Sequence, residues 1–152
     1  MATVTMPEVN TARPQQRLTL QSQLDELSRL WPWIEALAAE YAIPADMQFA
    51  IQLCLEEALS NIIRHGYLGE PNHPITVDCC TPAGTHELVF TVEDHAPAFD
   101  PLQVAEIPAP TSIDELQVGG QGIRLMRKFA GSLAYQRLLI GNRLTIGFAL
   151  PR

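Results

Sequence analysis

The sequence predicts an α+β fold, a two-layer sandwich in which helices cover one face of a mixed, mainly antiparallel sheet. Apolar residues recur at helical spacing as far as Tyr67, and from Ile75 onward they alternate at the two-residue period of strands. Turn residues divide the alternating part into hairpins. Helices combined with antiparallel hairpins pack as two layers around one core.

We expect a single domain at residues 16–152, preceded by a flexible lead-in at residues 1–15. The lead-in is rich in Thr, Pro, Asn and Gln and has no sustained period. The chain has 152 residues, 47% of them hydrophobic, which is enough to bury a sizeable core without metals or disulfides.

The domain is expected to begin with a short edge strand at Arg17–Leu20, followed by a helix with a leucine stripe. Ser22 is the candidate N-cap of that helix. Pro32 lacks a backbone N–H, so the helix either kinks there or starts near Trp31 with the proline in its first turn.

A second, longer helix is expected to begin at Ala45 or Asp46 and to end at Gly66 and Gly69. It should carry polar residues inside an otherwise apolar run, which makes it the first place to look for chemistry.

The sheet is expected to consist largely of two hairpins. The first pairs a strand from Ile75 with one that ends at Glu93–Asp94, where a proline-bearing turn stops further ladder pairing. A long loop at about 102–118 follows, and then a short helix that starts after the glycines of 119–122. The second hairpin turns at Gly141–Asn142.

Charge and cysteine content exclude several functional classes. The net charge is −7 with only 10 scattered basic residues, which argues against a nucleic-acid surface. The three cysteines show neither a disulfide framework nor a zinc spacing, and no apolar run reaches membrane-spanning length. We therefore expect a cytoplasmic protein with no direct contact to nucleic acid or membrane.

Three polar residues of the long helix, Glu57, Asn61 and His65, follow one another at four-residue spacing and should share one face. Glu56 projects roughly 140° away from Asn61 at about 100° per residue. Glu57 is therefore the carboxylate that stands next to the amide of Asn61. Such pairs are usually solvated, so the pattern needs support from elsewhere in the chain.

The run Gly119–Gly122 opens directly into a helix, so its free backbone N–H groups and the helix dipole favour an anion such as phosphate. It is not a P-loop, because no Lys-Ser/Thr pair follows it. Lys128 is the only lysine, so P-loop NTPases and eukaryotic-type protein kinases lose a residue that they require.

Asp94 closes a strand and opens a turn, where an aspartate is usually an ordinary turn residue. If it is buried and ionised, it needs a hydrogen-bond donor, and the exocyclic amine of adenine would be one.

The order of these motifs resembles the N, G1 and G2 boxes of the Bergerat-fold (GHKL) ATPases, and most closely the anti-sigma factor serine-protein kinases of bacterial stress and sporulation switches. The likeness spans roughly residues 17–150. The matching stretches are Glu57–Tyr67 (EALSNIIRHGY), Val92–Asp94 with Phe99–Pro101, Gly119–Met126 and Asn142–Thr145.

The resemblance implies roles in phosphate transfer. Asn61 would hold Mg²⁺ through the nucleotide phosphates, and Glu57 would be the general base for a serine hydroxyl. Gly120 and Gly122 would present backbone N–H groups to the phosphates, the loop at 102–118 would be the ATP lid, and His65 would either orient its neighbours or be structural.

On the adenine side the resemblance assigns Asp94, with Thr145 as a weaker candidate beside it. The family commonly has glycine two and four residues after the aspartate, whereas this chain has Ala96 and Ala98. A methyl group at these positions restricts φ and would hinder a close approach of the nucleotide to the backbone.

The function that the resemblance implies is that of an anti-sigma factor or related switch regulator. It would bind Mg-ATP, phosphorylate a serine on a small antagonist protein, hold a sigma factor or another regulated protein, and form a homodimer. The alternative is a non-catalytic, nucleotide-gated protein-binding module in which the altered G1 turn has weakened the chemistry.

Overall fold

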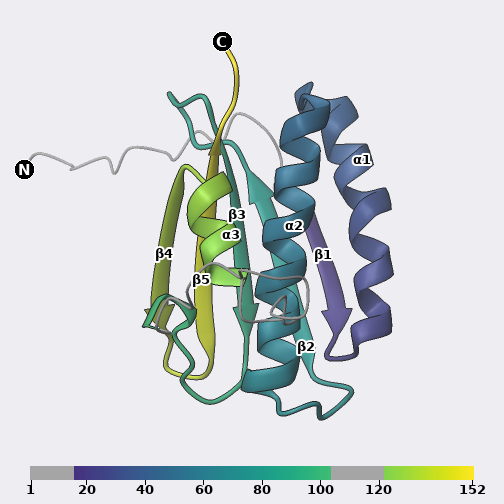
Figure 1. Ribbon diagram of the computed structural model, residues 1–152, viewed down its shortest axis with the longest axis vertical. Coiled ribbons are helices and arrows are strands. Elements are labelled where there is room, and N and C mark those ends of the chain that lie inside the picture. The colour runs from purple at the N-terminus through teal and green to yellow at the C-terminus, as the bar shows by residue number, and fades with distance from the viewer. Residues whose placement is uncertain (1–15, 104–121) are drawn as a thin grey trace, which may run out of the picture.

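The computed structural model describes residues 16–103 and 122–152, which form three α-helices on one five-stranded sheet (Figure 1). The predicted α+β sandwich is confirmed. Gly120 and nearly all of the candidate lid lie outside the described residues. The elements are β1 (Gln16–Gln21), η1 (Leu24–Arg29), α1 (Leu30–Tyr41), α2 (Ala45–Asn61), η2 (Ile62–Gly66), β2 (Pro74–Cys80), β3 (Glu87–Asp94), η3 (Pro101–Gln103), α3 (Gly122–Phe129), β4 (Ser132–Arg137) and β5 (Asn142–Ala149).

The sheet has the order β1-β2-β3-β5-β4, and all of these neighbours pair antiparallel. After β3 the chain forms α3 and then β4. It returns as β5, which lies between β3 and β4 in the sheet. This insertion places the start of β5 beside the end of β3, so that Asn142 faces Asp94 across the ladder.

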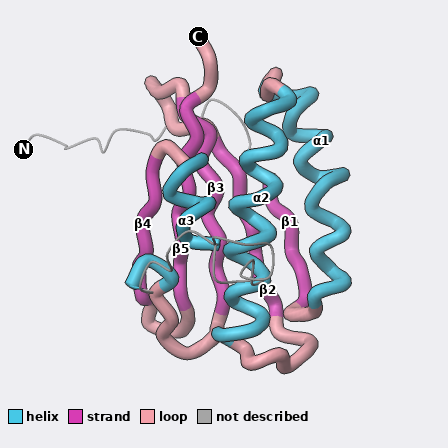
Figure 2. The backbone as a smooth tube through the Cα atoms, viewed as in Figure 1, coloured by secondary structure: helices cyan, strands magenta, loops and turns pink. Residues whose placement is uncertain are grey.

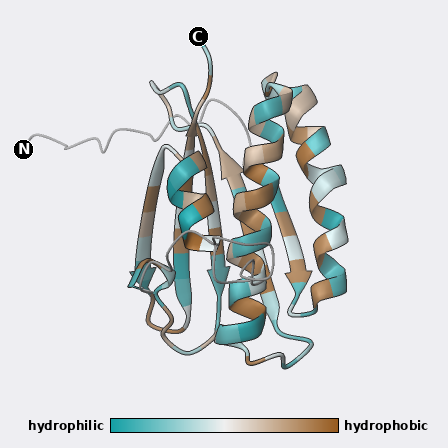
Figure 3. Ribbon diagram, in the orientation of Figure 1, coloured by the Kyte–Doolittle hydropathy of each residue, from teal (hydrophilic) through white to brown (hydrophobic). Residues whose placement is uncertain are grey.

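The helices cover one face of the sheet, with α2 between α1 and α3 (Figures 1 and 2). Each helix carries both hydrophobic and hydrophilic residues, as a single covering layer requires (Figure 3). In the described ranges no helix is long and apolar enough to cross a membrane.

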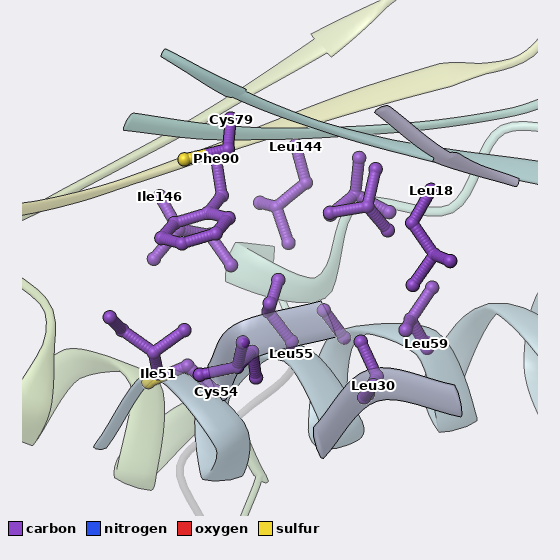
Figure 4. Packing of buried hydrophobic residues seen from close by; sticks show 14 of the residues in the cluster. Leu18, Leu30, Ile51, Cys54, Leu55, Leu59, Cys79, Phe90, Leu144 and Ile146 are labelled. Atoms are coloured by element: carbon purple, nitrogen blue, oxygen red, sulfur yellow. The ribbon is translucent and has the colours of Figure 1, made fainter. Parts of the chain in front are cut away.

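The core lies between the two layers. Inward side chains of the strands, such as Phe90 and Ile146, meet Ile51 and Leu55 from α2 (Figure 4). Phe90 is fully buried and meets the ring of Phe148 edge to face, with 5.9 Å between the ring centroids. The helix that carries the candidate catalytic residues is therefore fixed to the sheet by its other side.

The first helical segment starts as a 3₁₀ turn, and α1 begins at Leu30, so Pro32 lies in its first turn as expected. The predicted capping role of Ser22 is wrong. Its hydroxyl donates to the carbonyl of Glu70 (2.6 Å) and accepts from the backbone N–H of His73 (3.0 Å). Ser22 is buried, and its side chain bonds to the loop that contains Glu70 and His73 instead of capping the helix.

The long helix begins at Ala45 as predicted, but its end differs from a regular α-helix. After Asn61 the chain forms a π-helical turn, closed by the bond from the N–H of Tyr67 to the carbonyl of Ile62 (2.8 Å). A π turn holds more residues than an α turn. Side chains beyond Asn61 are therefore rotated away from the face on which helical periodicity would place them.

The packing of Phe90 predicts a large loss of stability when its ring is removed. Phe90→Ala should lower the free energy of unfolding by about 3–5 kcal/mol, because it leaves a cavity between the layers. Urea denaturation measures this, and Phe49→Ala is the matched control because Phe49 is 59% exposed. Equal losses in the two variants would contradict this description of the core.

Candidate functional site

Asn61, Asp94 and Asn142 meet at the end of the sandwich where α2 and β3 finish and β5 starts (Figure 1). All three are polar and buried. They open onto one cavity, whose other walls are mainly apolar. The cavity is lined by Ala58, Asn61, Ile62, Asp94, Phe99, Pro101, Tyr135, Asn142 and Leu144.

Asp94 is only 3% exposed, and two donors reach its oxygen Oδ1: the backbone N–H of Ala96 (2.9 Å) and the side-chain amide of Asn142 (2.9 Å). Burial raises the pKa of Asp94, and these two hydrogen bonds act against that rise. Because both bonds go to the same oxygen, Oδ2 is the one that can accept from a bound ligand.

The turn after Asp94 does not need glycine in the described structure. Neither Ala96 nor Ala98 has a positive φ. The methyl group of Ala96 is buried against Gly66, where a Cβ placed on Gly66 would lie 3.1 Å from that of Ala96. The expected φ restriction therefore has no effect on this turn, and the absence of a side chain at Gly66 makes room for the extra methyl.

Asn61 is the last residue of α2, and its side chain reaches the same cavity. Within the described part of the chain its amide makes no hydrogen bond that would occupy it. An amide oxygen in this position is a suitable ligand for a hard cation such as Mg²⁺.

Glu57 lies one turn before Asn61, half-buried against the start of α3. A Cβ placed on Gly122 would lie only 2.1 Å from Oε2 of Glu57, so a residue with a side chain there would collide with the carboxylate. This Oε2 is buried and has no hydrogen-bond partner among the described residues. A carboxylate oxygen without a partner can accept a proton or a hydrogen bond from a ligand.

The surroundings of Glu57 favour its protonated form. Burial raises the pKa of this carboxyl, Arg64 acts against the rise, and Glu56 adds to it. The neighbouring Glu56 differs, because it accepts a hydrogen bond from the side chain of Gln52 (2.7 Å). On the η1 side of Glu57 an open cleft of about 290 Å³ gives access from solvent.

His65 does not lie with Glu57 and Asn61, as the four-residue spacing had suggested. It is exposed, and its ring stacks on Phe99 with 5.8 Å between the centroids. The π turn at 62–66 causes this difference, because it changes the number of residues per turn directly before His65.

The structure does not bring Thr145 to the cavity. Neighbouring strand residues point to opposite faces, and Leu144 lines the cavity, so Thr145 faces the side of the sheet away from the helices. Asn142 takes the place beside Asp94. Its position in the Gly141–Asn142 turn was visible in the sequence, but only the strand register shows that it faces Asp94.

The cysteines offer no reactive thiolate. Burial raises the pKa of both Cys54 and Cys79 to about 12. The chemistry of this end of the molecule therefore rests on carboxylates and amides.

Comparison with known proteins gives a family match over most of the chain. The model of the histidine kinase-like ATPase domain matches residues 20–148. The serine/threonine-protein kinase BtrW of Bordetella bronchiseptica is 36% identical over 114 residues, covering 75% of this chain and 79% of that protein. The anti-sigma F factor of Halalkalibacterium halodurans is 28% identical over 109 residues, or 72% of each chain.

Solved structures show the same fold. The histidine kinase domain from the Erythrobacter litoralis EL346 blue-light activated histidine kinase superposes with a TM-score of 0.53 at 19% identity. The match covers 84% of this chain and 60% of that one. At this identity the likeness shows shared architecture alone.

The raised pKa of Glu57 predicts a pH-dependent gain of stability in Glu57→Gln. Above its raised pKa the wild-type carboxylate is charged in the folded as well as the unfolded protein and its burial is unfavourable, whereas below its unfolded pKa of 4.5 it is neutral in both. The variant should therefore have the higher urea midpoint at pH 7, and the gain should fade as the pH falls through the raised pKa toward 4.5. Glu35→Gln, an exposed change on α1, is the control. A gain that persists unchanged at pH 4 would contradict this explanation.

Proposed function

Because this chain belongs to the histidine kinase-like ATPase domain family, and within it to the anti-sigma factor serine kinases, we propose that it binds Mg-ATP and phosphorylates a serine of a small antagonist protein. One observation carries the proposal. The helix α2 places Glu57 and Asn61 one turn apart, and Asn61 shares a cavity with the buried carboxylate of Asp94.

The cavity holds about 20 Å³, so it must widen to take an adenine base, but its lining carries the groups that such a base needs. Asp94 has one carboxylate oxygen that is held by two donors and one that can accept from the exocyclic amine of adenine. Apolar side chains such as Ile62 and Leu144 provide surfaces against which a flat base can pack.

The phosphates would then extend toward Asn61 and the start of α3. Asn61 offers its amide oxygen to Mg²⁺, which neutralises phosphate charge when bound. Gly122 is the first residue of α3, so the backbone N–H groups at this helix start would face a bound anion. The same role for Gly120 follows from the family resemblance.

Glu57 is the proposed general base. As the serine Oγ forms its bond to the γ-phosphorus, the bond from that phosphorus to the bridging oxygen breaks, ADP leaves, and the hydroxyl proton passes to the carboxylate of Glu57. Burial suits this role, because a raised pKa makes the carboxylate a stronger base. The open cleft beside Glu57 provides a route by which a protein substrate can bring its hydroxyl to the carboxylate.

The names of two relatives support a proposal for the partners. One of them is named a serine/threonine-protein kinase and another an anti-sigma F factor. We therefore propose a cytoplasmic homodimer that holds a sigma factor or another regulated protein and releases it according to the phosphorylation of the antagonist. The alternative is a non-catalytic binding module. It rested on Ala96 and Ala98, and their ordinary φ angles answer only the part of that argument that concerned backbone restriction.

The assignment of the base predicts a separation of binding from catalysis. With radiolabelled ATP and the cognate antagonist, Glu57→Gln should lower the transfer rate by about 100-fold or more, the usual contribution of a general base. Its dissociation constant for ATP should stay within about threefold, because the base acts only on the hydroxyl. Glu56→Gln, one residue away and bonded to Gln52, should keep its activity. If Glu57→Gln transfers phosphate at the wild-type rate, the role of Glu57 is refuted.

The assignment of Asp94 predicts a defect in binding itself. Asp94→Asn replaces a charged acceptor, and loss of a hydrogen bond to a charged group of about 1.5–3 kcal/mol should weaken ATP binding by roughly 10- to 100-fold in calorimetry. Asp100→Asn is the matched control, because Asp100 accepts from the N–H of Leu102 instead. Unchanged affinity in Asp94→Asn would move the adenine site elsewhere.

A further inference from the structure

The side chain of Asn142 has one orientation that satisfies its neighbours. Acceptors surround its Nδ2 atom and donors surround its Oδ1 atom, so the amide cannot be turned over without loss of these bonds. Nδ2 donates to Oδ1 of Asp94 (2.9 Å), the carbonyl of Pro97 (3.1 Å) and the carbonyl of Ala96 (3.2 Å), and Oδ1 accepts from the hydroxyl of Tyr135 and the N–H of Phe99 (3.2 Å).

The β4–β5 hairpin reinforces this arrangement through its backbone. Arg137 donates from Nη1 to the carbonyls of Ala96 (2.9 Å) and Gly141 (2.8 Å), which ties the turn after Asp94 to the hairpin. Gly141 has a φ of 98°, and a Cβ there would lie 1.7 Å from the carbonyl oxygen of Asp94. The hairpin therefore passes directly against the end of β3.

The result is a fixed carboxylate. Asn142 and the backbone N–H of Ala96 both donate to Oδ1 of Asp94, which leaves Oδ2 without a hydrogen bond from the described residues. The hydrogen bond from Asn142 is also the largest of the influences that hold down the pKa of Asp94 against burial, ahead of the N–H of Ala96 and the charges of His95 and Arg137. In its ionised form Asp94 accepts a hydrogen bond from an amino group and repels a carbonyl.

We propose that Asn142 is a positioning residue that sets base specificity. Because it orients the Asp94 carboxylate, the site takes a purine with an amino group at C6 and rejects one with a carbonyl at C6. The proposal rests on the proposed nucleotide site. It assigns the discrimination to a residue of the β4–β5 hairpin rather than to Asp94 alone.

The test compares ATP with inosine triphosphate, which carries a carbonyl in place of the amino group. Calorimetry with Mg²⁺ should show that the wild type binds ATP more tightly. Asn142→Ala should weaken ATP binding by about tenfold, the cost of roughly one good hydrogen bond. Binding of inosine triphosphate should change by less than about threefold on the same scale, so the ratio of the two affinities falls.

Two further variants separate positioning from general support. Arg137→Lys keeps the positive charge near Asp94 but cannot reproduce both bonds to the carbonyls of Ala96 and Gly141, so both nucleotides should weaken by the same factor. Tyr135→Phe removes a donor to Oδ1 of Asn142 and should lower the ATP preference in part, which keeps the test open if Asn142→Ala does not fold.

The outcomes distinguish the two proposals. If the wild type binds neither nucleotide, the proposed function fails and this inference fails with it. If the wild type prefers ATP but the variants at Asn142 and Tyr135 keep the full preference, or if Asn142→Ala weakens both nucleotides equally, the role of Asn142 is overturned while the nucleotide site stands.

Discussion

The hydrogen bond between Asp94 and Asn142 is the contact on which the candidate site depends. A buried carboxylate is unfavourable unless donors satisfy it, and here one donor comes from its own turn and the other from the next strand of the sheet. That second donor is available because β5 is inserted between β3 and β4, which sets Asn142 opposite Asp94. The topology of the sheet thus fixes the polarity of the cavity.

Close approaches at glycine bring the rest of the site together. Gly122 lets α3 start against the carboxylate of Glu57, Gly66 makes room for the methyl group of Ala96, and Gly141 lets the hairpin pass the end of β3. The helix α2 carries both Glu57 and Asn61, and it is held in place because its other face is buried against the sheet (Figure 4). Rigid packing on one side and missing side chains on the other leave Glu57 with an oxygen that has no hydrogen-bond partner among the described residues.

Sequence periodicity was sufficient for the architecture, because the architecture follows from local repeats. The choice of Glu57 over Glu56 as the base stays a prediction. Periodicity failed where tertiary structure decides. The π turn that displaces His65 leaves no sequence pattern that we recognised, and the burial of Ser22 depends on a loop about fifty residues away in the chain. Thr145 was chosen from its place in a motif, whereas the alternation of side chains in β5 turns it away and presents Asn142.

The central claim is that a nucleotide binds between the end of α2 and the β3–β5 pair. An NMR titration of the labelled protein with Mg²⁺ and a non-hydrolysable ATP analogue tests it most directly. If the nucleotide binds there, amide shifts should concentrate at Asn61, at the turn from Asp94 to Phe99 and at Asn142. Shifts confined to the separate cleft formed by Met47, Phe129 and Phe148, or no shifts at saturating nucleotide, would contradict it.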